Sequence, residues 1–442
     1  MRPKPGVWES EKWGSRFFTI WTGQAFSLLG SQLVQFSLIW WLTKTTGSAT
    51  VLATATLVGL LPQVFINPVA GTLVDRYPRR LIMIFADGLI AAATGVLALL
   101  FLSGTAQIWH VYLLMFIRSM AGGFHWPSMQ AATSLMVPKT HLTRIQGINQ
   151  TLNGGMNIFS APLGALLLET LPLQGILGID IFTAFLAILP LVFIAIPEPN
   201  PEATRETGAR RASVWQDFRA GLQYVMGWPG LVILLMMATL INLLLNPASS
   251  LLPILIFKHF GGQAWHLAWM ESTLGVGAIA GGVLLSVWGG FRRRIITSFL
   301  GLLLIGISNI VIGVLPPSGF MLAVASAFVL GFGLPITNGP LLAVVQASVA
   351  PEMQGRVFTL VSSLASAMTP LGLLIAGPVA DAFGVQTWYL AGGFLTAFLG
   401  IAAAFIPAVL NIEAGRGEPE ALPAGDSGAV IEPAIVPVNA QD

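Results

Sequence analysis

Four charged side chains lie well inside long apolar stretches of this 442-residue sequence, where they are suited to acid–base chemistry. Asp87, Asp180 and Glu271 are the acids, and Arg118 is the base. A carboxylate in a low-dielectric interior binds a proton more readily than one in water, so each acid is a candidate to load and release a proton. An unpaired charge in hydrocarbon costs several kcal/mol, so Arg118 must face a bundle interior and have partners.

The sequence does not identify which acid pairs with Arg118. If its helix begins at Trp109, Arg118 lies about 13 Å from the outer face at 1.5 Å per residue. Asp87 or Asp180 either neutralises Arg118 or carries a transported proton. Glu271 has no basic residue in any nearby apolar stretch, so we rank it first for proton coupling, with Asp87, Asp180 and Arg118 as the other candidates. Glu169 and Asp381 fall at outer helix ends and are expected to face water.

A charge-dense loop, Gly71-Thr-Leu-Val-Asp-Arg-Tyr-Pro-Arg-Arg80, joins two apolar segments. Only 9% of the chain is charged, yet one acid and three arginines fall within six residues: Asp75, Arg76, Arg79 and Arg80. The excess of basic residues in cytoplasmic loops explains the arginines. A short link between helices needs no acid, and an acid here can pair with arginines or with a helix N-terminus. The functional interpretation of the loop therefore depends on Asp75.

Membrane helices must position these groups, because 55% of the residues are hydrophobic and the mean hydropathy is +0.79. A formal net charge of +2 argues against nucleic acid as a partner, and the absence of cysteine excludes disulfides and Cys-based metal sites. Apolar segments near or above the ~20 residues that cross a bilayer recur twelve times. We expect helices at 16–42, 50–73, 81–103, 108–135, 145–171, 175–196, 229–257, 264–288, 295–315, 319–343, 356–380 and 386–410.

The basic residues predict the orientation of these helices. With twelve spans both termini share one side, and eighteen of the 21 Lys and Arg fall there. Only Lys44 and Lys258 fall on the other side, so both termini are expected in the cytoplasm. The predicted order is a cytoplasmic segment at 1–15, a six-helix bundle at 16–196, a cytoplasmic linker at 197–228, a second six-helix bundle at 229–410 and a disordered cytoplasmic tail at 411–442. Within the linker, 217–227 is a candidate surface helix.

An internal repeat relates the two predicted bundles. Gln146-Gly147 and Pro162-Leu163-Gly164 recur 208 residues later as Gln354-Gly355 and Pro370-Leu371-Gly372, and Gly123-x-x-x-Pro127 recurs as Gly331-x-x-x-Pro335. The second half keeps arginines at 292–294 where the charge-dense loop would repeat but has no acid there, and Ser326 is the counterpart of Arg118. Two repeated halves joined by a loop are typical of transporters that bind substrate near the midplane and alternate between two states.

Polar side chains on the apolar helices predict a substrate cavity. Asn149, Asn153 and Asn157 recur every four residues and so share one helix face, which lipid would not tolerate. Trp126 can supply an apolar wall, and His125 is expected to be a packed helix residue, since no second ligand stands at metal spacing. The remaining cavity candidates are Gln24, Gln32, Gln35, Gln63, Asn67, Asn242, Asn246 and Asn338.

Several of these stretches together resemble a known family. The charge-dense loop, Phe116-Ile-Arg-Ser119, Gly355-Arg-Val-Phe358, residues 18–27 and residues 42–49 are similar to the macrolide-efflux, drug:proton antiporter branch of the major facilitator superfamily. The resemblance implies an all-α membrane protein with twelve helices in two pseudo-repeats. It also implies a gating role for Gly71, Asp75, Arg76, Arg79 and Arg80, with Arg356 placed as their partner, and a proton-linked role for Arg118. Tyr77-Pro78 stands where many members have a glycine.

The predicted function is export of bulky amphiphilic compounds across a bacterial cytoplasmic membrane by proton-coupled alternating access. The resemblance implies no cofactor beyond the proton gradient, and the expected partners are a small amphiphilic substrate and the lipid bilayer, with the chain acting as a monomer. No nucleotide-binding loop of the type G-x-x-x-x-G-K-[S/T] is present, which argues against primary pumping. Export or uptake of a siderophore or metabolite is the alternative within transport. A non-transporting sensor and a membrane-embedded enzyme are alternatives outside it, and the chain is expected not to be an enzyme.

Overall fold

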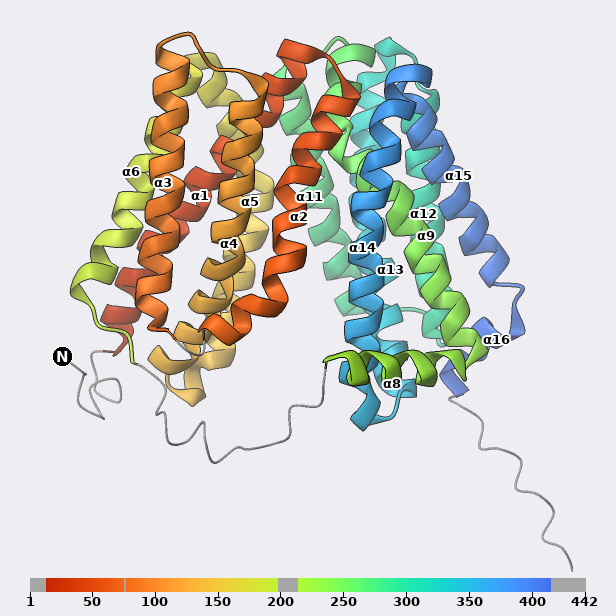
Figure 1. The fold of residues 1–442 in the computed structure, drawn as a ribbon. Coiled ribbons are helices and arrows are strands. Elements are labelled where there is room, and N and C mark those ends of the chain that lie inside the picture. The colour runs from red at the N-terminus through yellow and green to blue at the C-terminus, as the bar shows by residue number, and fades with distance from the viewer. Residues whose placement is uncertain (1–12, 75–76, 198–213, 415–442) are drawn as a thin grey trace, which may run out of the picture.

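The structure is a computed structural model that describes residues 13–74, 77–197 and 214–414. Every described element is a helix (Figure 1). The twelve helices of nineteen residues or more are α1 (Trp13–Thr46), α2 (Ala49–Val74), α3 (Arg79–Leu102), α4 (Ile108–Met136), α5 (Leu142–Thr170), α6 (Leu173–Phe193), α9 (Pro229–Ser250), α11 (Ala264–Trp288), α12 (Arg294–Val314), α13 (Phe320–Ser348), α14 (Pro351–Phe383) and α15 (Val385–Ala403). They match the twelve expected segments, with ends shifted by a few residues.

Nine of these helices are long and apolar enough to cross a membrane, by length and composition. The other three, α2, α4 and α5, have 26 to 29 residues, which is also sufficient length. They carry the polar residues from which the sequence predicts a cavity, including Arg118 on α4 and Asn149 and Asn153 on α5. Such polar residues make α4 and α5 less apolar on average, whereas the apolar stretch of α2 within the described residues is Ala49–Gln63.

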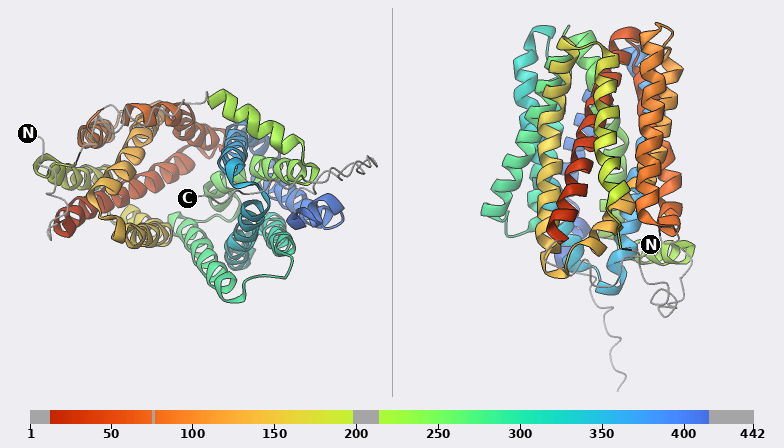
Figure 2. Two further views of the ribbon diagram at one scale, coloured as in Figure 1. Left: turned by 90° about the horizontal axis from the view of Figure 1, so that it is seen from below. Right: turned by 90° about the vertical axis from the view of Figure 1, so that its left-hand side faces the viewer.

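Helices from the two halves of the chain lie in two groups side by side (Figure 2). The same packing pattern occurs in each group: the pairs α2–α4, α3–α4, α3–α6 and α1–α5 correspond to α11–α13, α12–α13, α12–α15 and α9–α14. This correspondence agrees with the sequence repeat and confirms the two pseudo-repeats. The groups meet where α2 packs on α14 and α5 packs on α11. The exact domain boundaries stay predictions.

Three local features refine the expected segments. The seventh expected helix breaks after Ser250 and continues as short α10 (Leu252–Ile254) and the five-residue π-helix η2 (Leu255–His259). Pro253, in α10, lacks the backbone N–H that a continuous α-helix needs. Helix α8 (Val214–Met226) lies across one end of the bundle, as Figure 1 shows, in the predicted linker. The predicted tail begins at 411, but Ile412 is buried and the Glu413 carboxylate accepts a hydrogen bond from the Ile295 N–H at 2.8 Å.

Shorter elements complete the described chain. These are η1 (Lys139–His141), η3 (Pro317–Gly319), α16 (Pro407–Leu410) and η4 (Ile412–Ala414). Helix α1 begins at the end of the bundle where the short helix α16 also lies (Figure 1). We call this the terminal end and the opposite one the far end.

Glycines allow helices α11 and α13 of the second half to pack closely. A Cβ atom at Gly331 on α13 would overlap the carbonyl oxygen of Leu274 on α11, and one at Gly277 on α11 would overlap the carbonyl oxygen of Phe328. These neighbours are backbone atoms and cannot move aside as a flexible side chain would. Gly282, also on α11, has no atom within 4 Å of its Cβ position.

Replacing Gly331 with alanine is therefore expected to destabilise the protein by about 1–3 kcal/mol, because the helices must separate to relieve the overlap. Gly282→Ala is the matched control and should be neutral or slightly stabilising, since alanine favours a helix by about 1 kcal/mol over glycine. Thermal unfolding of purified protein in detergent measures both. Equal melting temperatures for the two variants would contradict the packing argument.

Candidate functional site

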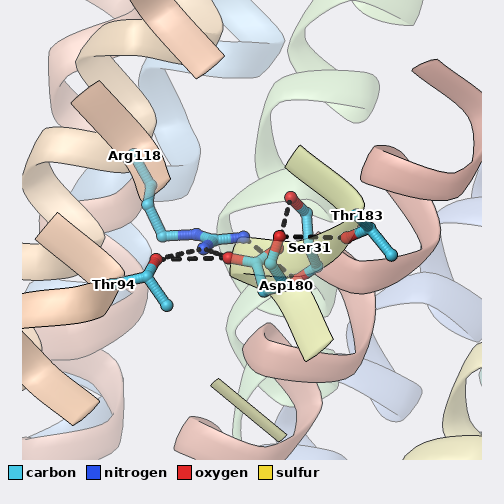
Figure 3. Close-up of polar contacts among 5 residues, drawn as sticks. All are labelled: Ser31, Thr94, Arg118, Asp180 and Thr183. Atoms are coloured by element: carbon cyan, nitrogen blue, oxygen red, sulfur yellow. Dashed lines mark hydrogen bonds and ion pairs between the residues drawn. The ribbon is translucent and has the colours of Figure 1, made fainter. Parts of the chain in front are cut away.

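Arg118 forms an ion pair with Asp180 inside the first group of helices (Figure 3). The Arg118 Nη1 and Asp180 Oδ2 atoms are 2.6 Å apart, and the side chains are 11% and 1% exposed. Arg118 also donates from Nη1 to the Thr94 hydroxyl at 3.2 Å and from Nη2 to the Ser31 carbonyl at 3.3 Å. The Asp180 carboxylate accepts from the Ser31 and Thr94 hydroxyls at 3.3 and 3.2 Å. Of the two candidate partners of Arg118, the structure selects Asp180.

Four helices contribute to this group, which we call the arginine layer: Ser31 from α1, Thr94 from α3, Arg118 from α4 and Asp180 from α6. A buried charge is tolerated when it is paired and hydrogen-bonded. Here one positive and one negative charge cancel, and three hydroxyl or carbonyl groups complete the bonding. Asp180 is therefore already engaged with a base.

Asp87 lies in a second polar group, nearer the terminal end of the bundle. The Gln24 amide donates to Asp87 Oδ2 at 3.1 Å, and His125 Nε2 lies 3.3 Å from Asp87 Oδ1. The side chains of Asp87 and His125 are 6% and 12% exposed. His125 lies on α4 as expected, and its side chain faces Asp87, a contact that was not predicted from the sequence. We call Gln24, Asp87 and His125 the histidine layer.

Glu271 lies on α11, the helix of the second half that packs on α5. Its side chain is half-buried, and within the described ranges its carboxylate forms no hydrogen bond or ion pair. Its neighbour Ser272 donates to the Ile158 carbonyl on α5 at 2.8 Å. Glu271 is therefore close to the contact between the two groups of helices and away from both polar layers. Its assignment to proton coupling stays a prediction.

Two adjoining cavities are bounded by helices of the first half. The larger one, of about 350 Å³, is lined by residues that include Gln24, Gln32, Gln35, Gln63, Asp87, Arg118 and His125. The smaller one, of about 40 Å³, is lined by residues that include Trp21, Gln24, His125, Trp126, Asn149 and Asn153. The Trp21 indole donates to the Asn149 amide oxygen at 2.7 Å. Seven of the twelve predicted cavity residues thus line these two adjoining cavities.

The other five predicted cavity residues are placed elsewhere or are not described. Asn246 donates to the Asn242 amide oxygen at 3.0 Å and to the Thr369 hydroxyl at 2.8 Å, linking α9 to α14. Asn157 and Asn338 are exposed. Among the residues that the structure describes, neither cavity includes these four. The side chain of Asn67 lies outside the described residues.

The charge-dense loop is described only in part. Asp75 and Arg76 lie outside the described residues, as does the packing of Gly71. Arg79 donates from Nη1 to the Ala131 carbonyl on α4 at 3.1 Å, and Arg80 donates to the carbonyls of Leu191 and Val192 at the end of α6. A basic side chain at a helix C-terminus satisfies its free carbonyls. Both arginines therefore bind neighbouring helices of the first half.

Arg356, the predicted partner of the loop, lies at the start of α14. Its side chain is exposed, and its Nη1 atom contacts the Met353 sulfur at 3.6 Å. The backbone of Arg356 packs against Gly221 on α8, where a Cβ atom would lie 3.1 Å from the Arg356 carbonyl oxygen. A contact between Arg356 and Asp75 stays a prediction because Asp75 is not described.

Asp381 joins the two halves at the far end of the bundle. From the last turn of α14 its carboxylate accepts hydrogen bonds from the Ser48 hydroxyl at 2.8 Å and from the backbone N–H groups of Ala49 and Thr50 at 2.8 and 2.9 Å. Ala49 and Thr50 begin α2. Asp381 faces solvent as expected, but it also caps a helix of the other half, since a helix N-terminus has free N–H groups and attracts an anion.

Comparisons with known proteins point to one family. The family model of the Major Facilitator Superfamily matches residues 20–373. Macrolide efflux protein A of Streptococcus pyogenes is 34% identical over 405 residues, which cover 91% of this chain and 98% of that protein. Multidrug efflux pump Tap of Mycobacterium tuberculosis is 28% identical over 377 residues, covering 83% of this chain and 87% of that protein.

Solved transporter structures share the fold at low identity. The nucleoside transporter NupG is 15% identical, with a TM-score of 0.60 over 86% of this chain and 97% of that chain. The peptide transporter POT is 14% identical, with a TM-score of 0.65 over 93% of this chain and 97% of that chain. At such identities the similarity shows the fold alone.

Proposed function

Because the chain belongs to the Major Facilitator Superfamily and is a multi-pass membrane transporter, we propose that it exports bulky amphiphilic compounds of the macrolide class. The observation that carries this proposal is the 34% identity to Macrolide efflux protein A along nearly the whole length of both chains. Export would be driven by the proton gradient across a bacterial cytoplasmic membrane. The proposed exporter would act without a cofactor and as a monomer.

The proposed orientation places both termini in the cytoplasm. It is supported by the excess of Lys and Arg on that side of the predicted topology and by the position of the start of α1 and of α16 at one end of the bundle. The terminal end then faces the cytoplasm, and the far end, where Asp381 caps α2, faces outward. Substrate would enter the cavity from the cytoplasm or the inner leaflet of the membrane.

The cavity chemistry supports an amphiphilic substrate. Tryptophan and methionine side chains supply apolar surface in the two cavities, and amides from α1 and α5 supply hydrogen-bonding groups. Ligand sites commonly have volumes of about 300–1,000 Å³, so the larger cavity is at the low end of that range. A bulky compound would therefore need the halves to move or the two cavities to join. Alternating access provides such a movement.

Proton coupling requires that protonation favour one of the two transporter states over the other. The acids that are candidates for this role are Glu271 and Asp87, while Asp180 is already paired with Arg118. The charge-dense loop around Asp75, with Arg79 and Arg80 bound to neighbouring helices, would hold the cytoplasmic side closed in the outward-facing state. Arg356 would be its partner across the halves.

An efflux assay tests the proposal. In a pump-deficient bacterial host, expression of the chain is expected to lower the accumulation of radiolabelled erythromycin, a macrolide, and addition of an uncoupler should restore it. An Arg118→Ala variant expressed at the same level serves as the inactive control. If accumulation is unaffected by both expression and uncoupling, the export proposal fails, and higher accumulation on expression would indicate uptake.

A further inference from the structure

We propose that Asp87 and His125, held by Gln24, form the site that binds the transported proton. This inference rests on the proposed function, because it names the proton site of a proton-driven exporter. It also assigns a role to His125, which the sequence reading treated as a packing residue. The proposal depends on the geometry of the histidine layer, on its position relative to the arginine layer and on its place in the cavity wall.

The histidine layer has unused capacity for hydrogen bonding. Gln24 is 2% exposed, and its amide oxygen has no hydrogen-bond partner among the described residues. His125 Nε2 is buried and likewise lacks a hydrogen bond within the described part of the chain, although Asp87 Oδ1 is only 3.3 Å away. The two atoms are close but not aligned for a hydrogen bond. A rotation of the protonated imidazole would convert this contact into a charged hydrogen bond to Asp87 Oδ1, which is stronger than a neutral one.

The two polar layers are related by a constant spacing along three helices. Gln24 and Ser31 are seven residues apart on α1, Asp87 and Thr94 on α3, and His125 and Arg118 on α4. Seven residues make about two helical turns, or roughly 10 Å. On α6 the residue seven positions from Asp180 is Ala187, which is fully buried where Gly23 of α1 approaches it. The histidine layer therefore receives no charge from α6.

The charges of the two layers differ in a way that suits a one-proton site. The charged or titratable groups around Asp87 are His125 and Arg118 on α4 and Asp180 on α6, while Gln24 on α1 is neutral. Arg118 and Asp180 cancel. The histidine layer carries one negative charge when the imidazole is neutral and none when it is protonated. Uptake of one proton thus removes the net charge of a buried group, and charge interactions are strong in such surroundings.

The same side chains separate the two cavities. Gln24, Leu28 and His125 are the residues that line both the 350 Å³ and the 40 Å³ cavity. Two of these three side chains contact Asp87. A proton that changes how Asp87 holds Gln24 and His125 would therefore alter the wall between the cavities. This gives a direct physical link between proton binding and the space that a substrate occupies.

The fold itself does not require a histidine at this position. In the repeat, His125 corresponds to Gly333 on α13, as Arg118 corresponds to Ser326. A Cβ atom at Gly333 would lie 3.0 Å from an Ile305 side-chain atom and 3.1 Å from the Gly301 carbonyl oxygen, so the second half is tightly packed there. The first half instead accommodates an imidazole beside an acid.

The test separates gradient-driven transport from exchange in vesicles containing purified full-length protein. With one proton per substrate, a gradient of about one pH unit can sustain about a tenfold concentration difference. Wild type is expected to accumulate radiolabelled erythromycin to roughly that ratio and to exchange it without a gradient. His125→Gln and Asp87→Asn should lose the accumulation, leaving a ratio of about one, while exchange without a gradient remains measurable. His110→Gln, on the same helix but at the far end, should retain both.

Each outcome decides the proposal. Because glutamine can still bond to Asp87, a purely structural pair predicts that His125→Gln keeps gradient-driven accumulation, and that result would overturn the inference. The inference would also be overturned if Glu271→Gln lost accumulation while His125→Gln and Asp87→Asn kept it. If His125→Gln also loses substrate exchange, a double variant with the two residues swapped, Asp87→His with His125→Asp, decides. Recovery of accumulation in this double variant supports a proton site, and no recovery overturns it. If wild type shows neither mode, the proposed function fails and the inference fails with it.

Discussion

Replacing Arg118 with alanine is expected to abolish efflux. The substitution leaves Asp180, which is 1% exposed, without its ion-pair partner at 2.6 Å. Removing one partner of a buried pair costs about 3–5 kcal/mol because the other charge remains buried and uncompensated. The loss also removes the one permanently positive group among the four charged or titratable groups of the two polar layers. Erythromycin accumulation in expressing cells measures the effect, with the amount of protein in the membrane measured in parallel.

Two further variants separate function from stability. Arg118→Met combined with Asp180→Asn removes both charges, and replacing a buried ion pair with neutral groups is often harmless to stability. We expect this double variant to recover the melting temperature but not efflux. Ser326→Ala, at the repeat counterpart of Arg118, is the control and should leave efflux unchanged. Recovered efflux in the double variant would show that the pair has a structural role only.

Arg118 also shows how far the sequence alone can lead. An arginine within an apolar stretch predicts a buried, paired base, and the structure confirms this. The choice between Asp87 and Asp180 could not be made, because it depends on how α3, α4 and α6 rotate and slide against one another. Hydroxyl groups such as Ser31 and Thr94 give no distinct signal, since serine and threonine are common in membrane helices.

The helices themselves were more predictable than the contacts between them. Apolar length identified twelve segments because the bilayer imposes a minimum span. The repeat offset of 208 residues identified equivalent helices, and their packing pairs agree. The break after Ser250 was missed because apolar length alone does not show where a proline such as Pro253 interrupts a helix. The contact between His125 and Asp87 was missed because it joins two different helices. The sequence does show that His125 is seven residues from Arg118 and that Asp87 is seven residues from Thr94.

Asp381 was read as a solvent-facing acid, and its partners could not be seen from sequence. It contacts Ser48, Ala49 and Thr50, which lie more than 330 positions away in the chain. Nothing in the local sequence at either site signals the other. The structure nevertheless makes Asp381 a contact between the halves, because it lies on α14 and caps α2. Nearby, a Cβ atom at Gly377 would lie 2.8 Å from the Thr50 Cα atom, so the two helices are in close contact at this end.

In the proposed orientation this cap holds the outward-facing side closed. Opening that side requires α2 and α14 to separate, which breaks three hydrogen bonds and removes the carboxylate from the helix N-terminus. Losing a capping side chain costs about 0.5–2 kcal/mol, and the charge at the helix terminus adds about 0.3–1 kcal/mol. The cap therefore stabilises the outward-closed state by an amount that matters for an equilibrium between two states.

Asp381→Asn is accordingly expected to shift the protein toward the outward-open state, by roughly tenfold for a loss of about 1.4 kcal/mol. An amide can accept at one oxygen only and carries no charge, so it retains part of the cap. The chain has no cysteine, so spin labels can be attached at Ser103→Cys and Ser318→Cys, two exposed positions at the far end of the two halves. Distance measurements should show a larger long-distance population in Asp381→Asn. Glu169→Gln, another exposed acid at that end, should match wild type, and an unchanged distribution in Asp381→Asn would rule out the cap as a gate.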